Sequence, residues 1–284
     1  YDLLRIVLDA DPKNLFVPAH IWTPWFSVLG SMGGFDSMTE AFGDLTKHIY
    51  AVETGLSSDP LMNWRLSQLD GCILISNSDA HSPSKLGREA NIFDTDFTYD
   101  AIYKALADKN DKGLAATIEF FPEEGKYHFD GHRACQVRWH PQETIKNKGL
   151  CSACGKPVTV GVMARVEELA DRKEGSKSKR WRPYHNLVTL PGLIGEAKDM
   201  GTGSKAVEQA YMNLLRNLGS EFHILMDCPI EDIREAAGNV IAEGISRMRQ
   251  GKVQIAAGYD GEFGTIKIFE SGEREAIEQQ LSLF

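Results

Sequence analysis

The chain has 284 residues, of which 42% are hydrophobic and 25% are charged, and its formal net charge is −9 at pH 7. These values are typical of a globular protein, and the negative charge argues against a protein that coats nucleic acid nonspecifically. No run of 18 or more apolar residues occurs, so we expect no transmembrane helix and no membrane partner. The chain opens in a helix-like pattern without a leader, and we expect the start of the protein to lie upstream of Tyr1.

The first hundred residues alternate between strand-like and helix-like patterns. Short apolar runs predict strands at residues 15–18, 48–53 and 71–76. Capped segments predict helices at residues 38–42, 59–69 and 98–106. Strands that alternate with helices indicate βαβ units and a parallel sheet, and therefore an α/β fold.

The residue pattern changes after residue 112. A strand is predicted at 114–121, followed by a stretch rich in His and Cys up to about 155, and residues 172–182 are basic and predicted to be flexible. The remaining pattern predicts helices at 204–218 and 230–250, a strand at 221–226, and a hairpin formed by 253–257 and 265–269.

Asp79 and His81 are the most informative residues. They end the stretch Gly71-Cys-Ile-Leu-Ile-Ser-Asn-Ser-Asp-Ala-His81. Because side chains of a strand alternate, residues two apart project to the same side as the strand ends. A carboxylate and an imidazole offer a divalent metal one oxygen and one nitrogen ligand. The alternative is a capping Asp and a surface His.

Polar residues also follow the two earlier strands. His20 follows 15–18, and Glu53 ends 48–53. In a parallel barrel the carboxyl ends of the strands meet at one rim, where the chemistry of such folds is located. The four side chains therefore predict a metal site with catalytic function, although singly His20 could be structural and Glu53 could be a cap or an ion-pair partner.

The cysteines predict a second metal site. Cys151 and Cys154 form a Cys-x-x-Cys knuckle, and Cys135 lies sixteen positions upstream of it. A structural Zn²⁺ bound by three Cys and one His fits this spacing, with His140 favoured over His132 because Trp139-His-Pro predicts a rigid turn. A redox pair would need a strand before the motif and a helix after it. The five cysteines, an odd number, favour a reducing compartment, so we expect a cytoplasmic protein.

Basic and aromatic residues suggest contacts with DNA. Basic side chains can contact phosphates, and aromatic side chains can stack on bases. The alternatives are that the basic segment is a solvated linker and that the aromatic residues after His20 fill the barrel core. Lys205 ends a Gly-rich stretch that leads into a helix and so resembles an anion site. The candidate DNA-binding residues are Trp22, Trp25, Lys177, Lys179, Arg180, Trp181, Arg182, Lys205 and Tyr259.

Two strings resemble a known family. Phe16-Val-Pro-Ala-His20 and Ser76-Asn-Ser-Asp-Ala-His81 resemble the later metal motifs of the PHP (polymerase and histidinol phosphatase) domain. Longer strings that start at His20, Glu53 and Cys154 are similar to the endonuclease Q family of PHP-type DNA repair nucleases. The resemblance implies a distorted (β/α)7 barrel that binds up to three divalent ions (Zn²⁺, Mn²⁺ or Mg²⁺) and nicks DNA 5′ to deaminated bases.

The resemblance assigns His20, Asp79 and His81 as metal ligands, whereas Glu53 matches no usual ligand and is expected to support them. The His-x-His motif that begins PHP domains is absent. We therefore expect the C-terminal half of the barrel at 1–112, a zinc-ribbon-like module at 113–171 and a helical α+β DNA-binding domain at 172–284. Alone, this chain is expected to bind the barrel metals poorly and to lack full activity.

The expected partners are DNA with damaged bases and, in addition, replication or repair proteins. Two alternatives remain open at this point. The first is a PHP phosphoesterase that acts on small phosphate esters, and the second is a non-catalytic DNA-binding protein with a partial metal site.

Overall fold

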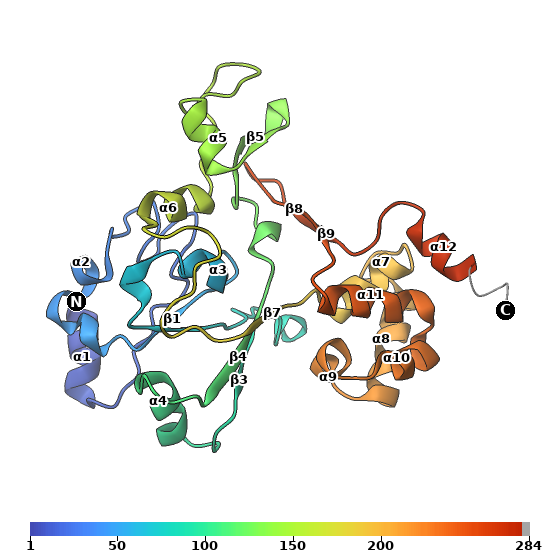
Figure 1. Cartoon of the computed structure of the whole chain (residues 1–284), viewed down its shortest axis with the longest axis horizontal. Coiled ribbons are helices and arrows are strands. Elements are labelled where there is room, and N and C mark those ends of the chain that lie inside the picture. Colours follow the sequence, from blue (N-terminus) through green and yellow to red (C-terminus); the bar gives the residue numbers. More distant parts are fainter. Residues whose placement is uncertain (280–284) are drawn as a thin grey trace. The chain divides into compact units, whose positions relative to one another are not determined.

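The computed structural model describes residues 1–279 and divides the chain into two compact units (Figure 1). Unit 1 contains residues 1–185 together with 257–264, and unit 2 contains 186–256 and the residues from Thr265 onward. The division into three segments expected from the sequence stays a prediction, since its boundaries near 112 and 171 both fall inside unit 1. In the described chain no helix is both long enough and apolar enough to span a bilayer.

Unit 1 contains a parallel strand pair. β1 (Ala51–Glu53) pairs in parallel with β2 (Ile73–Ile75), and all six residues are buried. The predicted strand at 15–18 is extended beside β1 without regular pairing, and the Glu53 amide donates to Pro18 O at 3.1 Å. A second sheet has the order β3–β4–β7, from β3 (Ala90–Phe93), β4 (Leu114–Glu119) and β7 (Tyr184–Asn186). The mixed α/β class is confirmed, while the half-barrel stays a prediction.

Polar side chains connect the two sheets where the backbone ladders stop. The Ser76 amide donates to Asn91 Oδ1 at 2.9 Å, and Asn91 Nδ2 donates back to Ser76 O at 2.7 Å. Ser76 Oγ donates to Ile118 O at 2.7 Å. These bonds satisfy buried backbone groups that have no strand partner, so the end of β2 is held against β3 and β4.

Side-chain caps begin the predicted helices of unit 1. Ser37 caps α2 (Met38–Phe42), as the sequence predicts, and Thr98 caps α4 (Tyr99–Ala107). The helix predicted at 59–69 is wrong in its length, because it breaks into α3 (Pro60–Asn63) and a 3-10 turn (Ser67–Leu69). Asn63 Nδ2 turns back to Asp59 O at 2.8 Å, which competes with continuation of the helix.

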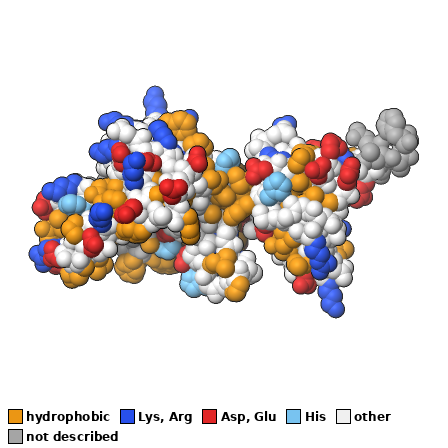
Figure 2. Space-filling model, turned by 90° about the horizontal axis from the view of Figure 1, so that it is seen from below, with side chains coloured by type: hydrophobic (Ala, Val, Ile, Leu, Met, Phe, Trp, Pro, Cys, Tyr) orange, Lys and Arg blue, Asp and Glu red, His pale blue; other side chains and the backbone are white. Residues whose placement is uncertain are grey.

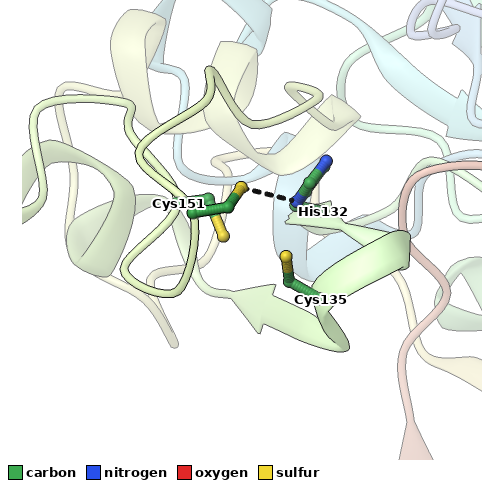
Figure 3. Close-up of side chains that lie close together, drawn as sticks. His132, Cys135 and Cys151 are labelled. Carbon is green, nitrogen blue, oxygen red and sulfur yellow. Dashed lines mark hydrogen bonds between the residues drawn. The ribbon is translucent and has the colours of Figure 1, made fainter.

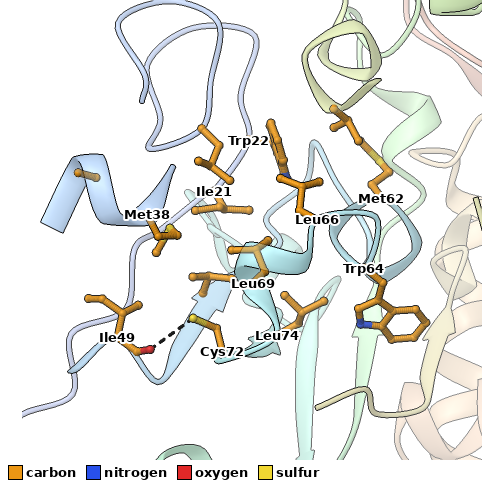
Figure 4. Packing of buried hydrophobic residues seen from close by; sticks show 14 of the residues in the cluster. Ile21, Trp22, Met38, Ile49, Met62, Trp64, Leu66, Leu69, Cys72 and Leu74 are labelled. Atoms are coloured by element: carbon orange, nitrogen blue, oxygen red, sulfur yellow. Dashed lines mark hydrogen bonds between the residues drawn. The ribbon is translucent and has the colours of Figure 1, made fainter. Parts of the chain in front are cut away.

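The larger hydrophobic core of unit 1 includes Trp22, which is fully buried (Figure 4). Ile21, Met38, Leu66 and Leu69 belong to the same core. Trp22 Nε1 donates to Asn63 Oδ1 at 2.8 Å, so the one polar atom of the ring is satisfied. Trp22 therefore stabilises the fold and is not available to stack on a DNA base, which corrects the contact predicted from the sequence.

The segment 172–182 is a strap that Arg180 and Arg182 fix to unit 1, and not a free linker. Arg180 Nη1 donates to Tyr50 O and Gly71 O, at 3.1 and 3.3 Å, and its Nη2 donates to Leu106 O at 2.8 Å. Arg182 likewise donates to Leu114 O at 2.8 Å. Both arginine side chains are buried and donate their hydrogen bonds to backbone carbonyls, so the structure does not support the DNA contacts predicted for Arg180 and Arg182.

The remaining elements of unit 1 include a small hairpin. β5 (Asp130–His132) pairs antiparallel with β6 (Val137–Trp139). The helices are α1 (Asp2–Ala10), α5 (Pro141–Lys146) and α6 (Val162–Leu169). Short 3-10 turns lie at Gly43–His48, Pro83–Lys85, Pro122–Glu124 and Arg133–Cys135.

Unit 2 is mainly helical, with one hairpin made by β8 (Gln254–Ala256) and β9 (Thr265–Lys267). The predicted strand at 221–226 is wrong: Ser220 caps a helix there, and no strand partner is present among the described residues. The single helix predicted at 230–250 divides at Gly238, whose φ of 87° no helix accommodates. The helices are α7 (Leu190–Ala197), α8 (Lys205–Leu218), α9 (Glu221–Met226), α10 (Ile230–Ala237), α11 (Asn239–Arg249) and α12 (Glu273–Gln279).

Replacing Arg180 with alanine should lower the free energy of unfolding by about 3 kcal/mol, because several buried carbonyls lose a charged donor and a cavity opens. The matched control is Lys179→Ala, since the Lys179 side chain is 83% exposed and should contribute less than about 0.5 kcal/mol. Urea titration followed by tryptophan fluorescence measures both. Equal losses of stability in the two variants would contradict this role of Arg180.

Candidate functional site

Glu53 organises the carboxyl end of β1. Its Oε2 accepts the His20 amide at 2.8 Å and lies 3.2 Å from His20 Nδ1, and its Oε1 accepts Asn77 Nδ2 at 2.8 Å. The side chain is only 9% exposed. One buried carboxylate therefore ties together the segments that follow three neighbouring extended stretches.

The structure brings together the residues that the sequence singled out at the strand ends. His20 Nε2 lies 3.9 Å from Asp79 Oδ2, and His81 Nδ1 lies 3.9 Å from Asp79 Oδ1. His81 Nδ1 is also 2.8 Å from Asp79 O. The side chain of His81 is 85% exposed and that of Asp79 is 44% exposed, so the cluster opens to solvent on one side. Their role as metal ligands stays a prediction.

Two of these residues have an unusual backbone. His20 and Asp79 have φ values of 44° and 46°, in the left-handed region that L-residues rarely adopt. Gly55 lies so close that a Cβ atom there would be 2.7 Å from His20 Nδ1, and its own φ is 62°. Strained backbone and a close glycine hold the His20 ring in one position, a pattern that is common at functional sites.

Behind this cluster lies a pair of buried acids that the sequence analysis missed. Glu119 ends β4 and accepts hydroxyl hydrogen bonds from Thr54 and Thr117. The register of Ala90 with Ile118 places Glu89 opposite Glu119 on the neighbouring strand. Burial, reinforced by the Glu119 charge, raises the pKa of Glu89 to about 9, and burial raises that of Glu119 to about 7. The only signal in the sequence was a glutamate directly before one strand and another at the end of the next strand.

A tighter cluster lies in the cysteine-rich stretch. His132, Cys135, Cys151 and Cys154 offer ligand atoms that all lie within 4.8 Å of one another, and the sticks converge in Figure 3. Cys154 Sγ is 3.4 Å from His132 Nδ1. Over residues 1–279 this is the only group of three or more potential ligands that meets this spacing. The donor set suits a tetrahedral Zn²⁺ site closed by four protein ligands.

The thiols interact strongly even without an ion. A hydrogen bond with Cys154 raises the pKa of Cys135 to about 11. Burial opposes ionisation of Cys151, but the backbone N–H groups of Ala153 and Cys154 outweigh it and lower the pKa of Cys151 to about 6. A thiolate in the centre of the cluster is the form that binds a metal ion.

The structure selects His132, whereas the sequence favoured His140. His140 instead begins α5, where its Nδ1 accepts the Gln142 amide at 3.5 Å. Its Nε2 lies 3.5 Å from Glu174. The hairpin β5–β6 explains the difference, because its turn carries Cys135 back beside His132 at the end of β5.

The other residues predicted to contact DNA differ in how exposed and how accessible they are. Trp25 is 54% exposed, in the loop that follows His20. Lys177 lies 3.9 Å above the Trp181 ring, and Lys179 is exposed. This strap binds carbonyls that precede β1 and β2, so it lies at the opposite end of the strands from His20. On the face shown in Figure 2, basic and acidic side chains are interspersed.

Two predicted contacts remain to be placed. Lys205 is the exposed first residue of α8, and the preceding Ser204 caps this helix by accepting the Val207 amide at 3.4 Å. The Tyr259 ring packs on Gly131, where an added Cβ would lie 2.4 Å from Tyr259 Cδ2. Tyr259 is therefore partly committed to the fold, while an anion-binding role for Lys205 stays a prediction.

Glu89→Gln should stabilise the protein at high pH. The folded pKa of about 9 lies above the ordinary value of 4.5, so the contribution of the protonated acid is full below pH 4.5 and is lost as pH rises toward 9. Glutamine keeps a donor without ionising, and should add about 2 kcal/mol at pH 8 and little at pH 5. Urea titrations at both pH values measure this, with exposed Glu168→Gln as the control. An equal gain at both pH values would contradict it.

Zinc content separates the two histidines. His132→Ala should release one equivalent of zinc relative to the unmodified protein, because the cluster loses a ligand. His140→Ala should keep that zinc and lose only about 1 kcal/mol of stability through its helix cap. Mass spectrometry of metals in the purified protein measures the zinc content of both variants. Loss of zinc in His140→Ala but not in His132→Ala would show that His140 is the ligand.

Comparisons with known proteins agree with this architecture. A family model described as the MJ0043 C-terminal domain matches residues 189–252, within unit 2. The chain is 32% identical over 296 aligned residues to the uncharacterized protein MJ0043 of Methanocaldococcus jannaschii, and covers 36% of it. It is 35% identical over 263 residues to the uncharacterized protein YqxK of Bacillus subtilis, and covers 62% of that protein. The chain thus spans between about a third and three fifths of these relatives.

Two solved structures match nearly the whole chain. The lesion-specific endonuclease PfuEndoQ from Pyrococcus furiosus is 33% identical with a TM-score of 0.85, over 99% of this chain and 68% of that one. Endonuclease Q in complex with a 27-mer duplex bearing an abasic lesion is 34% identical with a TM-score of 0.78, over 94% of this chain and 66% of that one. The chain belongs to the endonuclease Q family.

Proposed function

We propose that this protein acts as a metal-dependent endonuclease on damaged DNA and hydrolyses a phosphodiester 5′ to a deaminated base. The observation that carries the proposal is the match to a lesion-specific endonuclease at 33% identity, over a chain that brings His20, Asp79 and His81 together at the strand ends. The relative bound to a lesion-containing duplex supports DNA as the substrate.

The donor types at the strand ends, one carboxylate and two imidazoles, suit a divalent metal ion. The His20 Nδ1 atom faces Glu53, which leaves Nε2 directed toward Asp79. His81 Nδ1 is likewise engaged by Asp79 O, which leaves its Nε2 free. Histidine ligands of metals are commonly held in this way, by an oxygen atom on the other ring nitrogen. Among the residues described, His20, Asp79 and His81 would hold the ion.

When bound, a divalent ion supplies a water of lowered pKa and stabilises the charge on the oxygens of the phosphodiester. The protein residues prepare that chemistry. Glu53 sets the orientation of the His20 ring, and Gly55 allows the ring to approach the backbone. The exposed side of Asp79 and His81 leaves room for a phosphodiester.

The Cys3His cluster has a different function in this proposal. Its four protein ligands would close the coordination shell of a Zn²⁺ ion, which suits a structural ion and leaves no position for a substrate. The cluster joins the hairpin β5–β6 to the loop 147–157, which contains little regular structure. A bound ion would therefore stabilise a module too small to form its own core.

The assay uses an end-labelled duplex with one hypoxanthine, incubated with the protein and Mn²⁺, Mg²⁺ or Zn²⁺. We expect one slow nick on the 5′ side of the lesion, because the chain alone is expected to bind the barrel metals poorly. Asp79→Asn should lower the rate at least about 100-fold, because a charged oxygen ligand is lost. Gly55→Ala should lower it about 10-fold by displacing His20, whereas Gly71→Ala, where nothing lies within 4 Å, should keep it.

The other outcomes distinguish the alternative functions. Binding of the duplex without a nick would indicate a non-catalytic DNA-binding protein. Release of phosphate from a monoester without a nick would indicate a phosphoesterase for small substrates. Nicking that is equally fast in Asp79→Asn would show that the strand-end cluster is not the active site.

A further inference from the structure

Three aromatic side chains, two of them exposed, lie in neighbouring segments of unit 1. Trp25 packs edge to face on Tyr127, with 5.7 Å between ring centroids. Lys126, next to Tyr127 in the chain, lies 4.4 Å above the Phe263 ring. Phe263 is 71% exposed, and Trp25 is 54% exposed. We call Trp25, Tyr127 and Phe263 the aromatic strip; it begins in the loop that follows the candidate ligand His20.

Phe263 is exposed on a rigid loop. The loop 257–264 is bound to unit 1 by backbone hydrogen bonds, among them the Gly261 amide to Lys126 O at 3.0 Å. Asp260 adds two side-chain bonds, because it accepts Thr159 Oγ1 and the Arg133 amide, both at 2.6 Å. A large apolar side chain that is both exposed and firmly held is a feature of binding surfaces and not of flexible tips.

The other end of the strip is also held in place. The Leu29 amide donates to Ile21 O at 3.2 Å, and Thr23 N donates to Ser27 Oγ at 3.0 Å, so the loop is closed on itself. Arg165 Nε donates to Leu29 O at 3.2 Å and anchors the loop to α6. Trp25 therefore has a defined position between His20 and Tyr127.

The charges beside Phe263 favour nucleic acid as the occupant. The basic side chains of Lys126 and Arg133 are exposed. The nearby acids already have partners, since Asp260 accepts two hydrogen bonds and Glu262 is hydrogen-bonded to Tyr259. Separate aromatic rings with cations next to them are the pattern by which proteins stack unpaired bases and contact the flanking phosphates.

We propose that the aromatic strip is a stacking surface for unpaired DNA bases, with Phe263 as its outer end and Lys126 as a phosphate contact. This inference rests on the proposed function, because it names the form of DNA that the site receives. It also assigns the base contact of the loop to Phe263 and not to Tyr259, whose ring lies against Gly131.

The test measures binding of the full chain to two labelled duplexes, one fully paired and one with a single unpaired base, by fluorescence anisotropy. Phe263→Ala should weaken binding to the second duplex about 10-fold, and change binding to the paired duplex less than about 2-fold. Phe263→Trp should restore it. Phe97→Ala is the matched control, since Phe97 is fully exposed in the same unit, before α4.

Salt dependence tests the cation. Lys126→Gln should reduce the slope of log affinity against log salt concentration by about 1 for both duplexes, as expected for one lost phosphate contact. Equal binding of Phe263→Ala and Phe97→Ala to the duplex with the unpaired base would overturn the inference, even if the protein nicks DNA. Selective loss in Phe263→Ala without any nicking would support the stacking surface and overturn the nuclease. Failure of the unmodified chain to bind either duplex would overturn both.

Discussion

The candidate site depends on one buried carboxylate. Glu53 accepts hydrogen bonds from the His20 amide and the Asn77 side chain and lies beside the His20 ring. It thus adds side-chain contacts to the backbone bonds that join the ends of these three extended segments. Removing this acceptor would take the hydrogen-bond partner from the His20 amide and from the Asn77 side chain, and would free the His20 ring to turn. The orientation of His20 toward Asp79 follows from this arrangement, and Gly55 provides the space for it.

Two further devices hold the surfaces of unit 1 in place. The Cys3His cluster would close a module with little core, and the loop 257–264 is bound beside it through Asp260. In the strap, the guanidinium group of Arg180 donates hydrogen bonds to carbonyls at the amino ends of β1 and β2. A basic residue therefore stabilises the fold at one end of the strands, while the candidate site lies at the other.

The sequence alone determined the features that depend on local spacing. The spacing of Asp79 and His81 predicted that both would leave the strand on one side. The structure instead ends β2 at Ile75 and gives Asp79 a left-handed φ of 46°, so a turn, and not the alternation of a strand, brings His81 beside Asp79. The helix at Met38–Phe42 could be predicted because its cap, Ser37, is a neighbour in the chain. The Cys-x-x-Cys pair was equally recognisable, because four residues suffice to bring two thiols together.

Only the tertiary structure decided questions in which several residues of one type compete. His132 and His140 both flank Cys135, and the turn between β5 and β6 selects the first. Trp22 and Trp25 lie three residues apart, yet one is in the core and the other is exposed. Arg180 looked like a DNA contact until its carbonyl partners were known, and these lie 72 to 130 positions away in the chain. Burial and long-range partners depend on the packing of the whole unit, which no local pattern encodes.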